Sequence, residues 1–429
     1  MEKKINTSIQ TLLIGPITQL LPMTGLPLKG ALKDSQLEVL KAQGILISEG
    51  LIKEIGPFKK LYKQQKEAIQ NKQTQYIKPE TPVVAIPGFI DAHTHICFAG
   101  NRASDYALRN SGASYLEIAA AGGGIWDTVT HTRAASENEL AQNTRQNAQR
   151  HLQRGVTTIE VKSGYAASVK EELKMLRAIK KANENSAVDL ISCCLAAHVF
   201  PKDYPGSPSA YLEEIVQQLF PVLVKEKLTR RVDAFIEQTA FTPDVIAPYL
   251  AAAKIQGFDI CIHADQFTAG GSQVAIDHCA LSADHLEAST LKEINALAAS
   301  DTIAMALPGA SLGLGCAHAP ARKLLDAGAA LVIASDWNPG SAPMGHLLCQ
   351  AAILGAAEKL SQAEVLSAIG FRAAAALGLK DRGVLAPGYL ADILLFPTAD
   401  FSHILYQQGM MGPSHVIKRG VQVLSKQAD

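Results

Sequence analysis

The chain has 429 residues, of which 48% are hydrophobic and 19% are charged, so it can bury a large core. At about 100–200 residues per domain this length allows two or three domains, although one α/β barrel can take about 250 residues. Lys and Arg balance Asp and Glu at 40 each, and this zero formal charge gives no bulk field that favours nucleic acid or an anionic membrane.

The N-terminal part of the chain does not have the pattern of a signal peptide. Residues 11–23 are largely apolar but are interrupted by Gly15, Pro16 and Pro22. No uninterrupted apolar stretch reaches the roughly 18 residues that a membrane span needs. The seven cysteines are scattered and include no CxxC pair, which is typical of reduced thiols. We therefore expect a cytoplasmic protein with no membrane or nucleic-acid partner.

Two short β-like runs, 44–48 and 51–56, flank Glu49 and Gly50. This pattern predicts a hairpin that turns at those two residues. Residues 59–78 are rich in Lys and Gln, which indicates a solvated helix or an exposed connection. A basic interaction arm is the functional alternative for this segment.

From about residue 83 to residue 380, apolar β-branched runs alternate with helical stretches rich in Ala, Leu, Glu and Lys. Eight strands are expected, at 84–95, 157–163, 190–198, 232–237, 258–264, 279–285, 302–307 and 330–335. Helices are expected between them, including 169–183, 210–227, 243–256 and 289–299.

Continuous apolar strands that alternate with helices indicate a parallel sheet covered by helices. Eight such units predict an α/β protein with a TIM-like (β/α)8 barrel. A doubly wound sheet is the alternative, but no GxGxxG follows the first strand. Short strands return after residue 383. We therefore expect a small β-sandwich domain built from both chain ends, 1–82 and 385–429, beside a barrel at 83–384.

Reactive residues fall at the carboxyl ends of the expected strands, where barrel enzymes carry their chemistry. These residues are His93, His95, Lys162 to Tyr165, His198, Glu237, His263 to Gln266, Asp284, His285 and Asp336 to Gly340. A single strand-end histidine is more often a hydrogen-bonded structural residue, and Asp336 could simply open a turn. The coincidence of so many residues in register favours a functional site.

His93 and His95 are two residues apart, so an extended chain can direct both imidazoles to one point. Together with His263 and Asp336 they make a set of three nitrogen ligands and one oxygen ligand for a single divalent metal. Such a metal lowers the pKa of water towards neutrality, and Asp336 could take the water proton as a general base.

The sequence resembles the imidazolonepropionase family of the amidohydrolase superfamily. The barrel start PGFIDAHTH (87–95) and the tail PGYLAD (387–392) match the superfamily layout. The narrower resemblance is carried by FAGNR (98–102), GASYLEI (112–118), AGGGI (121–125), VKSGY (161–165), AAH (196–198), SADHLE (282–287) and SDWNPGS (335–341). It covers roughly residues 83–395.

Members of that family hydrolyse the cyclic amide bond of 4-imidazolone-5-propanoate to N-formimidoyl-L-glutamate, the third step of histidine degradation. The resemblance implies one zinc or iron ion on His93, His95, His263 and Asp336. It further implies that the substrate is contacted by Arg102, Tyr165, His198, Asn338, Gly340 and Ser341, and that His285 is an active-site histidine beyond the metal ligands.

These residue types suit a small planar substrate with one carboxylate. Arg102 can hold the carboxylate through a bidentate pair of hydrogen bonds; the alternative is that it only forms a salt bridge at the surface. Tyr115 and Tyr165 offer hydroxyls and an apolar face to the ring, with core packing as their alternative. In the expected mechanism hydroxide attacks the ring carbonyl, the metal and His285 stabilise the oxyanion, and Asp336 passes the proton to the leaving ring nitrogen.

Two positions depart from the family pattern. Gln266 stands where some members carry Glu, and we expect it to orient the ring by hydrogen bonds rather than to transfer protons. Trp337 replaces an expected Phe, which indicates a packing change.

A separate point concerns the number of metal ions. The fourth strand carries Glu237 rather than a lysine that could be carboxylated to bridge two metals, and this favours a single metal.

Two other functions are weighed against this one. Another amidohydrolase, one that deaminates a purine or pyrimidine, would share the metal site. A barrel that serves only as an assembly subunit would be expected to lack ligands, and none of the four is missing from the sequence. The sequence does not decide whether the bound metal is zinc or iron, and a homodimer is the default expectation for the oligomeric state.

Overall fold

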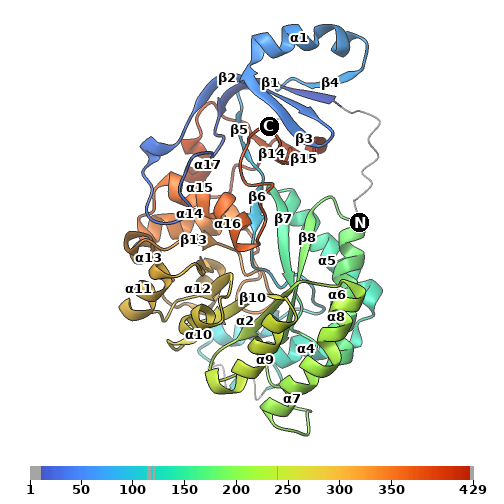
Figure 1. The fold of residues 1–429 in the computed structure, drawn as a ribbon, viewed down its shortest axis with the longest axis vertical. Helices are drawn as coiled ribbons and strands as arrows, with labels where there is room; N and C mark the ends of the chain where they lie inside the picture. The colour runs from blue at the N-terminus through green and yellow to red at the C-terminus, as the bar shows by residue number, and fades with distance from the viewer. Residues whose placement is uncertain (1–10, 114–116, 119–120, 239, 426–429) are drawn as a thin grey trace. The chain divides into compact units, whose positions relative to one another are not determined.

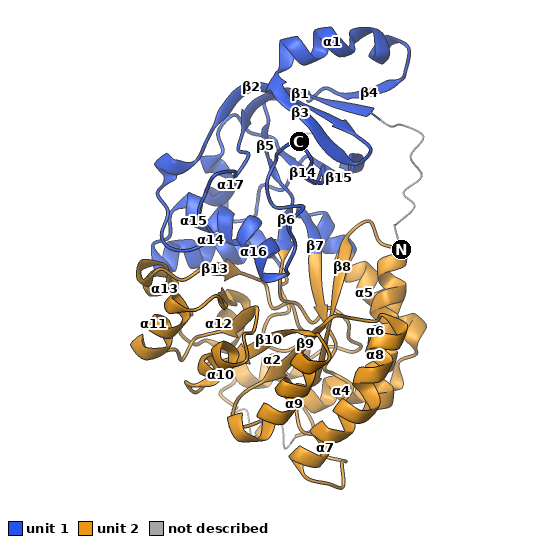
Figure 2. Cartoon of the chain, viewed as in Figure 1, with its two compact units in different colours: residues 1–90, 149–158, 346–429 blue, residues 91–148, 159–345 orange. Residues whose placement is uncertain are grey.

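The computed structural model describes residues 11–113, 117–118, 121–238 and 240–425. Tyr115, which the sequence places near the substrate ring, lies outside the described residues. The chain divides into two compact units, coloured separately in Figure 2. Unit 1 contains residues 1–90, 149–158 and 346–429, and unit 2 contains residues 91–148 and 159–345.

Unit 1 is built on one mixed sheet to which both ends of the chain contribute. Its strands follow the order β16-β15-β14-β5-β1-β2-β3, and β4 pairs with β1 (Figure 1). The strands are β1 (Thr11–Leu20), β2 (Leu40–Ser48), β3 (Leu51–Pro57), β4 (Thr74–Ile77), β5 (Val84–Pro87), β14 (Ile393–Phe396), β15 (His415–Lys418) and β16 (Val421–Ser425).

The period-two pattern of β1 places its apolar residues on both faces of this sheet. Leu12 and Ile14 belong to the main core, whereas Leu13 packs on the other face with Leu61 of helix α1 (Phe58–Gln70). The hairpin prediction is confirmed, because β2 and β3 pair at Ser48 and Leu51. The helix expected in the Lys/Gln-rich segment is also present, and it is followed by a strand, β4, that the composition did not indicate.

The second sheet is the barrel. Its strands run in chain order from β6 to β13, and each printed pairing between β8 and β13 is parallel. The strands are β6 (Phe89–Asp91), β7 (Val156–Lys162), β8 (Asp189–Ala197), β9 (Arg231–Phe235), β10 (Asp259–Ala264), β11 (Ser282–His285), β12 (Ile303–Ala306) and β13 (Leu331–Ile333).

The segments that follow the first and last barrel strands are hydrogen-bonded to each other. The Asp336 amide donates to the His93 carbonyl at 3.0 Å, and the His95 amide donates to the Trp337 carbonyl at 2.9 Å. The Asp91 carboxylate also accepts the Ser335 amide at 2.9 Å. An open doubly wound sheet has no such bonds between its first and last strands, so the (β/α)8 barrel prediction is confirmed.

The first expected strand, 84–95, is wrong as a single strand. Residues 84–87 form β5 and pair antiparallel with β14 of the unit 1 sheet, whereas the barrel strand β6 covers only Phe89–Asp91. Gly88 separates the two. A Cβ on Gly88 would lie 2.4 Å from the Thr157 hydroxyl oxygen, so glycine is required where the chain crosses from one sheet to the other.

Helices alternate with the barrel strands and cover them. In unit 2 these are α2 (Ala103–Asn110), α4 (Ile125–Ala134), α6 (Val169–Glu184), α7 (Pro208–Glu214), α8 (Phe220–Glu226), α9 (Pro243–Ile255), α10 (Gly271–Asp277), α11 (Leu291–Ala299), α12 (Pro308–Leu314) and α13 (Ala321–Ala327). Helix α5 (Glu137–Leu152) crosses the unit boundary. Unit 1 contains four helices that follow the last barrel strand in the sequence: α14 (Leu347–Glu358), α15 (Gln362–Ala368), α16 (Phe371–Ala376) and α17 (Ser402–Tyr406).

The helix predictions are confirmed, with one difference in detail. The expected helix at 210–227 consists of α7, a π-helical turn at Ile215–Leu219, and α8, which begins with Pro221 in its first turn. Side-chain caps mark two of the other helix starts, because Ser168 caps α6 and Thr290 forms a capping box with Glu293 at α11.

The α/β class, with a parallel barrel and a separate sheet from the chain ends, is therefore as the sequence predicted. The domain boundaries 1–82, 83–384 and 385–429 stay a prediction. Among the described residues, none of the helices is long and apolar enough to cross a membrane.

We predict that Gly88→Ala lowers the free energy of unfolding by about 1–3 kcal/mol, because the new methyl group overlaps Thr157. Gly56→Ala is the control, since a Cβ there meets nothing closer than 3.7 Å. Urea unfolding compares the two variants. Equal unfolding midpoints would contradict the steric role of Gly88.

Candidate active site

His93, Thr94 and His95 extend the first barrel strand beyond β6. The Lys162 amide donates to the Thr94 carbonyl at 2.9 Å, and the Thr94 hydroxyl donates to the Glu160 carbonyl at 2.6 Å. The segment is therefore hydrogen-bonded to β7 on one side, and on the other to the residues after β13. This extended backbone directs His93 and His95 to the same side, as the spacing predicted.

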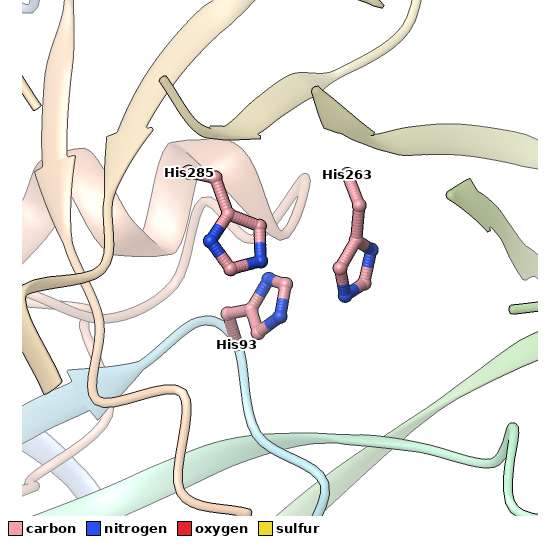
Figure 3. A group of neighbouring side chains, drawn as sticks. All are labelled: His93, His263 and His285. Carbon is pink, nitrogen blue, oxygen red and sulfur yellow. The ribbon is translucent and has the colours of Figure 1, made fainter. Parts of the chain in front are cut away.

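The imidazoles converge. His93 Nε2 lies 3.3 Å from His95 Nε2, and His263 Nε2 lies 3.4 Å from His95 Nε2. Figure 3 shows that the rings of His93, His263 and His285, which come from three different strands, also face one another. The ligand atoms of these three histidines all lie within 4.8 Å of one another.

Asp336 joins this cluster from the segment after β13. Its Oδ1 lies 3.4 Å from His95 Nε2 and 3.6 Å from His93 Nε2. His93, His95 and Asp336 form a second set whose ligand atoms lie within 4.8 Å of one another. The structure thus brings together all four residues that the sequence predicts as metal ligands.

Two buried carboxylates orient His93 and His263 by contacting the ring nitrogens that face away from the cluster. His93 Nδ1 donates to Asp284 Oδ2 at 2.7 Å, and His263 Nδ1 lies 3.1 Å from Asp233 Oδ2. A proton held on each Nδ1 leaves each Nε2 with a free lone pair. The lone pairs of His93 and His263 therefore point to one region, which is the arrangement that a bound cation satisfies.

The protonation states also suit a metal. Burial lowers the pKa values of His93, His95 and His263, so their imidazoles are neutral near pH 7. Burial raises the pKa of Asp336 to about 6, against the opposing effects of His285 and Asn338. Neutral imidazoles and a carboxylate are the donor set of a zinc or iron site, so these residues fit the predicted group.

The Asp336 loop is held in a sharp turn by Asn338. The Asn338 amide group donates to the Asp336 carbonyl at 2.7 Å, and its oxygen accepts the amides of Gly340 and Ser341 at 2.8 Å each. Asp336 itself has a φ of +49°. This strain in a non-glycine residue is tolerated where surrounding hydrogen bonds fix the backbone.

A cavity of about 520 Å³ opens beside the cluster in unit 2. This is within the usual range of about 300–1,000 Å³ for small-molecule sites. It is lined by His95, Arg102, Arg109, Ile125, Tyr165, His198, Phe235, Glu237, Gln238, His263, Gln266, Phe267, Thr268, His285, Leu314, Asp336, Asn338 and Ser341. Most of the residues predicted from the sequence are thus brought to one chamber.

Arg102 supplies positive charge to this cavity. Its guanidinium lies against Gly340, where an added Cβ would come within 1.3 Å of Nη2. Asp105 is 3.9 Å away and already accepts the Gly124 amide at 2.8 Å. Arg102 Nε is buried and has no hydrogen-bond partner among the described residues. Nε therefore remains as a hydrogen-bond donor that a bound anion could accept from.

Aromatic rings line the cavity beside the histidine cluster. His198 stacks on His95 with ring centroids 5.3 Å apart, and Tyr165 lies 5.6 Å from His198. His198 Nδ1 donates to the Gly164 carbonyl at 3.1 Å. Burial lowers the pKa of His198 to about 3, so this ring is neutral and can serve as a hydrogen-bonding partner for a ligand.

His285 is held differently from the other histidines. Burial alone would lower its pKa, but the Glu287 carboxylate, 3.6 Å from Nδ1, acts together with Asp336 and Asp284 to raise that pKa. Glu287 in turn accepts a hydrogen bond from the Ser311 hydroxyl at 3.0 Å. His285 is therefore the histidine of this cluster best suited to carry a proton.

Glu237 lines the cavity but is occupied by its neighbours. It accepts the amides of Gln238, Phe267 and Thr268 at 3.0, 3.1 and 3.0 Å, and also the Thr268 hydroxyl. Glu237 thus fixes the loop after β10 that carries Gln266. This is consistent with a site for one metal, in which no bridging group comes from the fourth strand.

Glu160, Lys162, Arg231, Asp233 and Asp284 are all buried inside the barrel beneath the cluster. Sequence reasoning noted Lys162 and Asp284 as strand-end residues but gave them no role, and it missed Glu160, Arg231 and Asp233. The signal was their spacing, since 160 and 162, and likewise 231 and 233, alternate with apolar residues in otherwise continuous hydrophobic strands. Arg109, a second arginine in the cavity wall, was also missed.

The model of the amidohydrolase family matches residues 84–423. A protein named imidazolonepropionase from Bdellovibrio bacteriovorus is 38% identical over 96% of both chains. The chain therefore belongs to the amidohydrolase family and, within it, to the imidazolonepropionases. A protein of the same name from Deinococcus deserti is 41% identical over 80% of this chain and 84% of its own. One from Symbiobacterium thermophilum is 36% identical over 95% and 96%.

Solved structures share the fold at lower sequence identity. Atrazine chlorohydrolase from Arthrobacter aurescens, complexed with zinc, superposes with a TM-score of 0.69 at 17% identity and covers 96% of this chain and 95% of its own. An adenosine deaminase from Xanthomonas campestris with bound zinc gives a TM-score of 0.66 at 18% identity, with 96% and 93% covered. At these identities the likeness shows the fold alone.

We predict that His263→Ala weakens metal binding by more than about 100-fold, because it removes a proposed ligand rather than an outer partner. Metal content after dialysis measures the effect. His131→Ala is the control, since His131 is a half-exposed histidine that bonds to Asp127 of its own helix. Full metal occupancy in His263→Ala would contradict the ligand role.

Proposed function

We propose that the protein hydrolyses the cyclic amide bond of 4-imidazolone-5-propanoate to N-formimidoyl-L-glutamate, a step of histidine degradation. The observation that carries this proposal is that Arg102 and several members of the histidine cluster line one cavity, and that the cluster's ligand atoms lie close enough together to hold a metal. The imidazolonepropionase name of the relatives, at 36–41% identity, supports the same reaction.

One divalent metal would be held by His93, His95, His263 and Asp336. When bound, it supplies a Lewis acid and lowers the pKa of water towards neutrality. Zinc is bound in two solved structures of this fold, and zinc or iron suits this donor set equally. Metal analysis of the purified protein decides between them.

The substrate is small, planar and monoanionic, and the cavity offers groups for each of its parts. Arg102 binds the propanoate carboxylate, since its side chain is only 12% exposed and its buried Nε has no hydrogen-bond partner among the described residues. Tyr165 and His198 bound the ring face and donate or accept hydrogen bonds at its edge. Gln266, Asn338, Gly340 and Ser341 surround the ligand, and Tyr115 is proposed to contact the ring.

Proton transfer is assigned to Asp336 and His285. Asp336 takes a proton from water as the water oxygen bonds to the ring carbonyl carbon. His285, positioned by Glu287, stabilises the negative charge that develops on the carbonyl oxygen. Asp336 then delivers its proton to the ring nitrogen as the carbon–nitrogen bond breaks. The products of this addition of water are a new carboxylate and the formimidoyl nitrogen of the opened ring.

A matched substrate assay tests the reaction. Purified protein should consume 4-imidazolone-5-propanoate and release N-formimidoyl-L-glutamate. Deamination of a purine or pyrimidine is the second candidate, and the fold similarity to an adenosine deaminase makes it worth testing in parallel. Ammonia release from guanine or cytosine without turnover of the imidazolone would overturn the proposal.

The homodimer stays a prediction, which light scattering of the purified protein tests.

We predict that Arg102→Ala lowers kcat/KM for 4-imidazolone-5-propanoate by about 100- to 1,000-fold, because a charged hydrogen-bonded pair contributes several kcal/mol to binding. Metal content should stay unchanged. Steady-state kinetics measures the loss. Arg177→Ala is the matched control, because Arg177 pairs with Glu226 on partly exposed helices. Unchanged kinetics in Arg102→Ala would remove this residue from the site.

A further inference from the structure

The barrel interior beneath the histidine cluster contains a buried ionic network. Lys162 Nζ lies 2.7 Å from Glu160 Oε2, 2.7 Å from Asp233 Oδ2 and 3.8 Å from Asp284 Oδ2. The side chains of Lys162, Glu160 and Asp233 are fully buried, and Asp284 is 1% exposed. A lysine buried to this degree has a specific reason to be there, because taking its charge out of water is costly.

The oxygens that face Lys162 are the same atoms that face the histidines. Asp233 Oδ2 lies between Lys162 Nζ and His263 Nδ1, at 2.7 and 3.1 Å. Asp284 Oδ2 likewise lies near both Lys162 Nζ and His93 Nδ1, at 3.8 and 2.7 Å. One ammonium group is therefore linked to two imidazoles through one carboxylate each.

The charges of the network support this link. Glu160 is contacted by a second cation, since Arg231 Nε lies 3.3 Å from its Oε1. Among the ion pairs of the described residues, Asp233 and Asp284 share Lys162 as their only lysine or arginine partner. Without Lys162, these two buried carboxylates would have no lysine or arginine partner among the ion pairs of the described residues.

We propose that Lys162 is a positioning residue for the metal site, which holds Asp233 and Asp284 so that His263 and His93 present their Nε2 lone pairs to one metal ion. The proposal rests on the proposed metal site. It adds one more residue behind the metal ligands: each histidine contacts a carboxylate, and both carboxylates contact Lys162. Lys162 does not touch the substrate, so it acts only through Asp233 and Asp284.

Lys162→Met tests the proposal, because methionine fills similar space without the charge. Lys418→Met is the matched control: Lys418 is also fully buried and pairs with Asp392 at 2.5 Å, but it belongs to unit 1, whereas the histidine cluster belongs to unit 2. Both substitutions break a buried ion pair and should lower the unfolding temperature of the metal-free protein. A merely structural role for Lys162 predicts that the two variants behave alike.

Metal affinity separates the two variants. The metal-free proteins are titrated with zinc in competition with a chromogenic chelator. We expect the dissociation constant to rise about 10- to 100-fold in Lys162→Met, as for other outer partners of metal ligands, and to stay within about threefold in Lys418→Met. Stabilisation by excess zinc should shrink correspondingly in Lys162→Met alone. Zinc affinity in Lys162→Met equal to that of the control would overturn the proposal.

A double-mutant cycle tests whether Lys162 acts on His93 through Asp284. Asp284→Asn removes the charge that links Lys162 to His93, so Lys162→Met should weaken zinc binding less in that background than in the native protein. Strictly additive losses would contradict a route through Asp284. Lys162→Gln replaces Lys162→Met should the latter fail to fold, with the same expected result. If the native protein itself binds no metal, the proposed metal site fails, and this outcome is distinct from a failure of Lys162 alone.

Discussion

The pairing of buried imidazoles with buried carboxylates is the constraint on which the site depends. His93 and Asp284, and His263 and Asp233, are all buried inside the barrel, where an unpaired polar group would be costly. Each carboxylate holds a proton on the far nitrogen of its histidine and leaves the near nitrogen free. Without these pairs the rings could rotate or change tautomer, and their lone pairs would no longer meet at one point.

The barrel makes this pairing possible because it places the ends of distant strands in a ring. Its closure depends on the bonds between the segments after the first and last strands, including the pair between the Asp336 amide and the His93 carbonyl. The same bonds place the Asp336 side chain beside His93 and His95. The bonds that close the barrel therefore also fix Asp336 in the candidate metal site, where its strained backbone is held by its neighbours.

The cavity beside the cluster decides what the metal chemistry acts on. Relatives of the same fold include proteins named for very different substrates, at 17–18% identity, so the barrel alone does not select a substrate. In this chain Arg102, whose guanidinium lies against Gly340, gives the cavity a cation whose Nε has no hydrogen-bond partner among the described residues. A carboxylate at one end and a hydrolysable ring at the other is the ligand that this arrangement favours.

Much of this could be predicted from the sequence, because its signals are local. Strand-end residues such as His93, His263 and Asp336 are recognised by their position after apolar runs, and the hairpin at Gly50 by its turn chemistry.

Other features depend on which strands become neighbours. The sequence did not show that residues 84–87 leave the barrel, because their apolar pattern suits either sheet and only the contact of Gly88 with Thr157 separates them. Nor did it show that Lys162 would meet Asp233 and Asp284, since these residues are 71 or more positions away along the chain and are joined only through the register of the parallel strands. Local chemistry thus determined the ligands, and the tertiary structure decided how their charges are held.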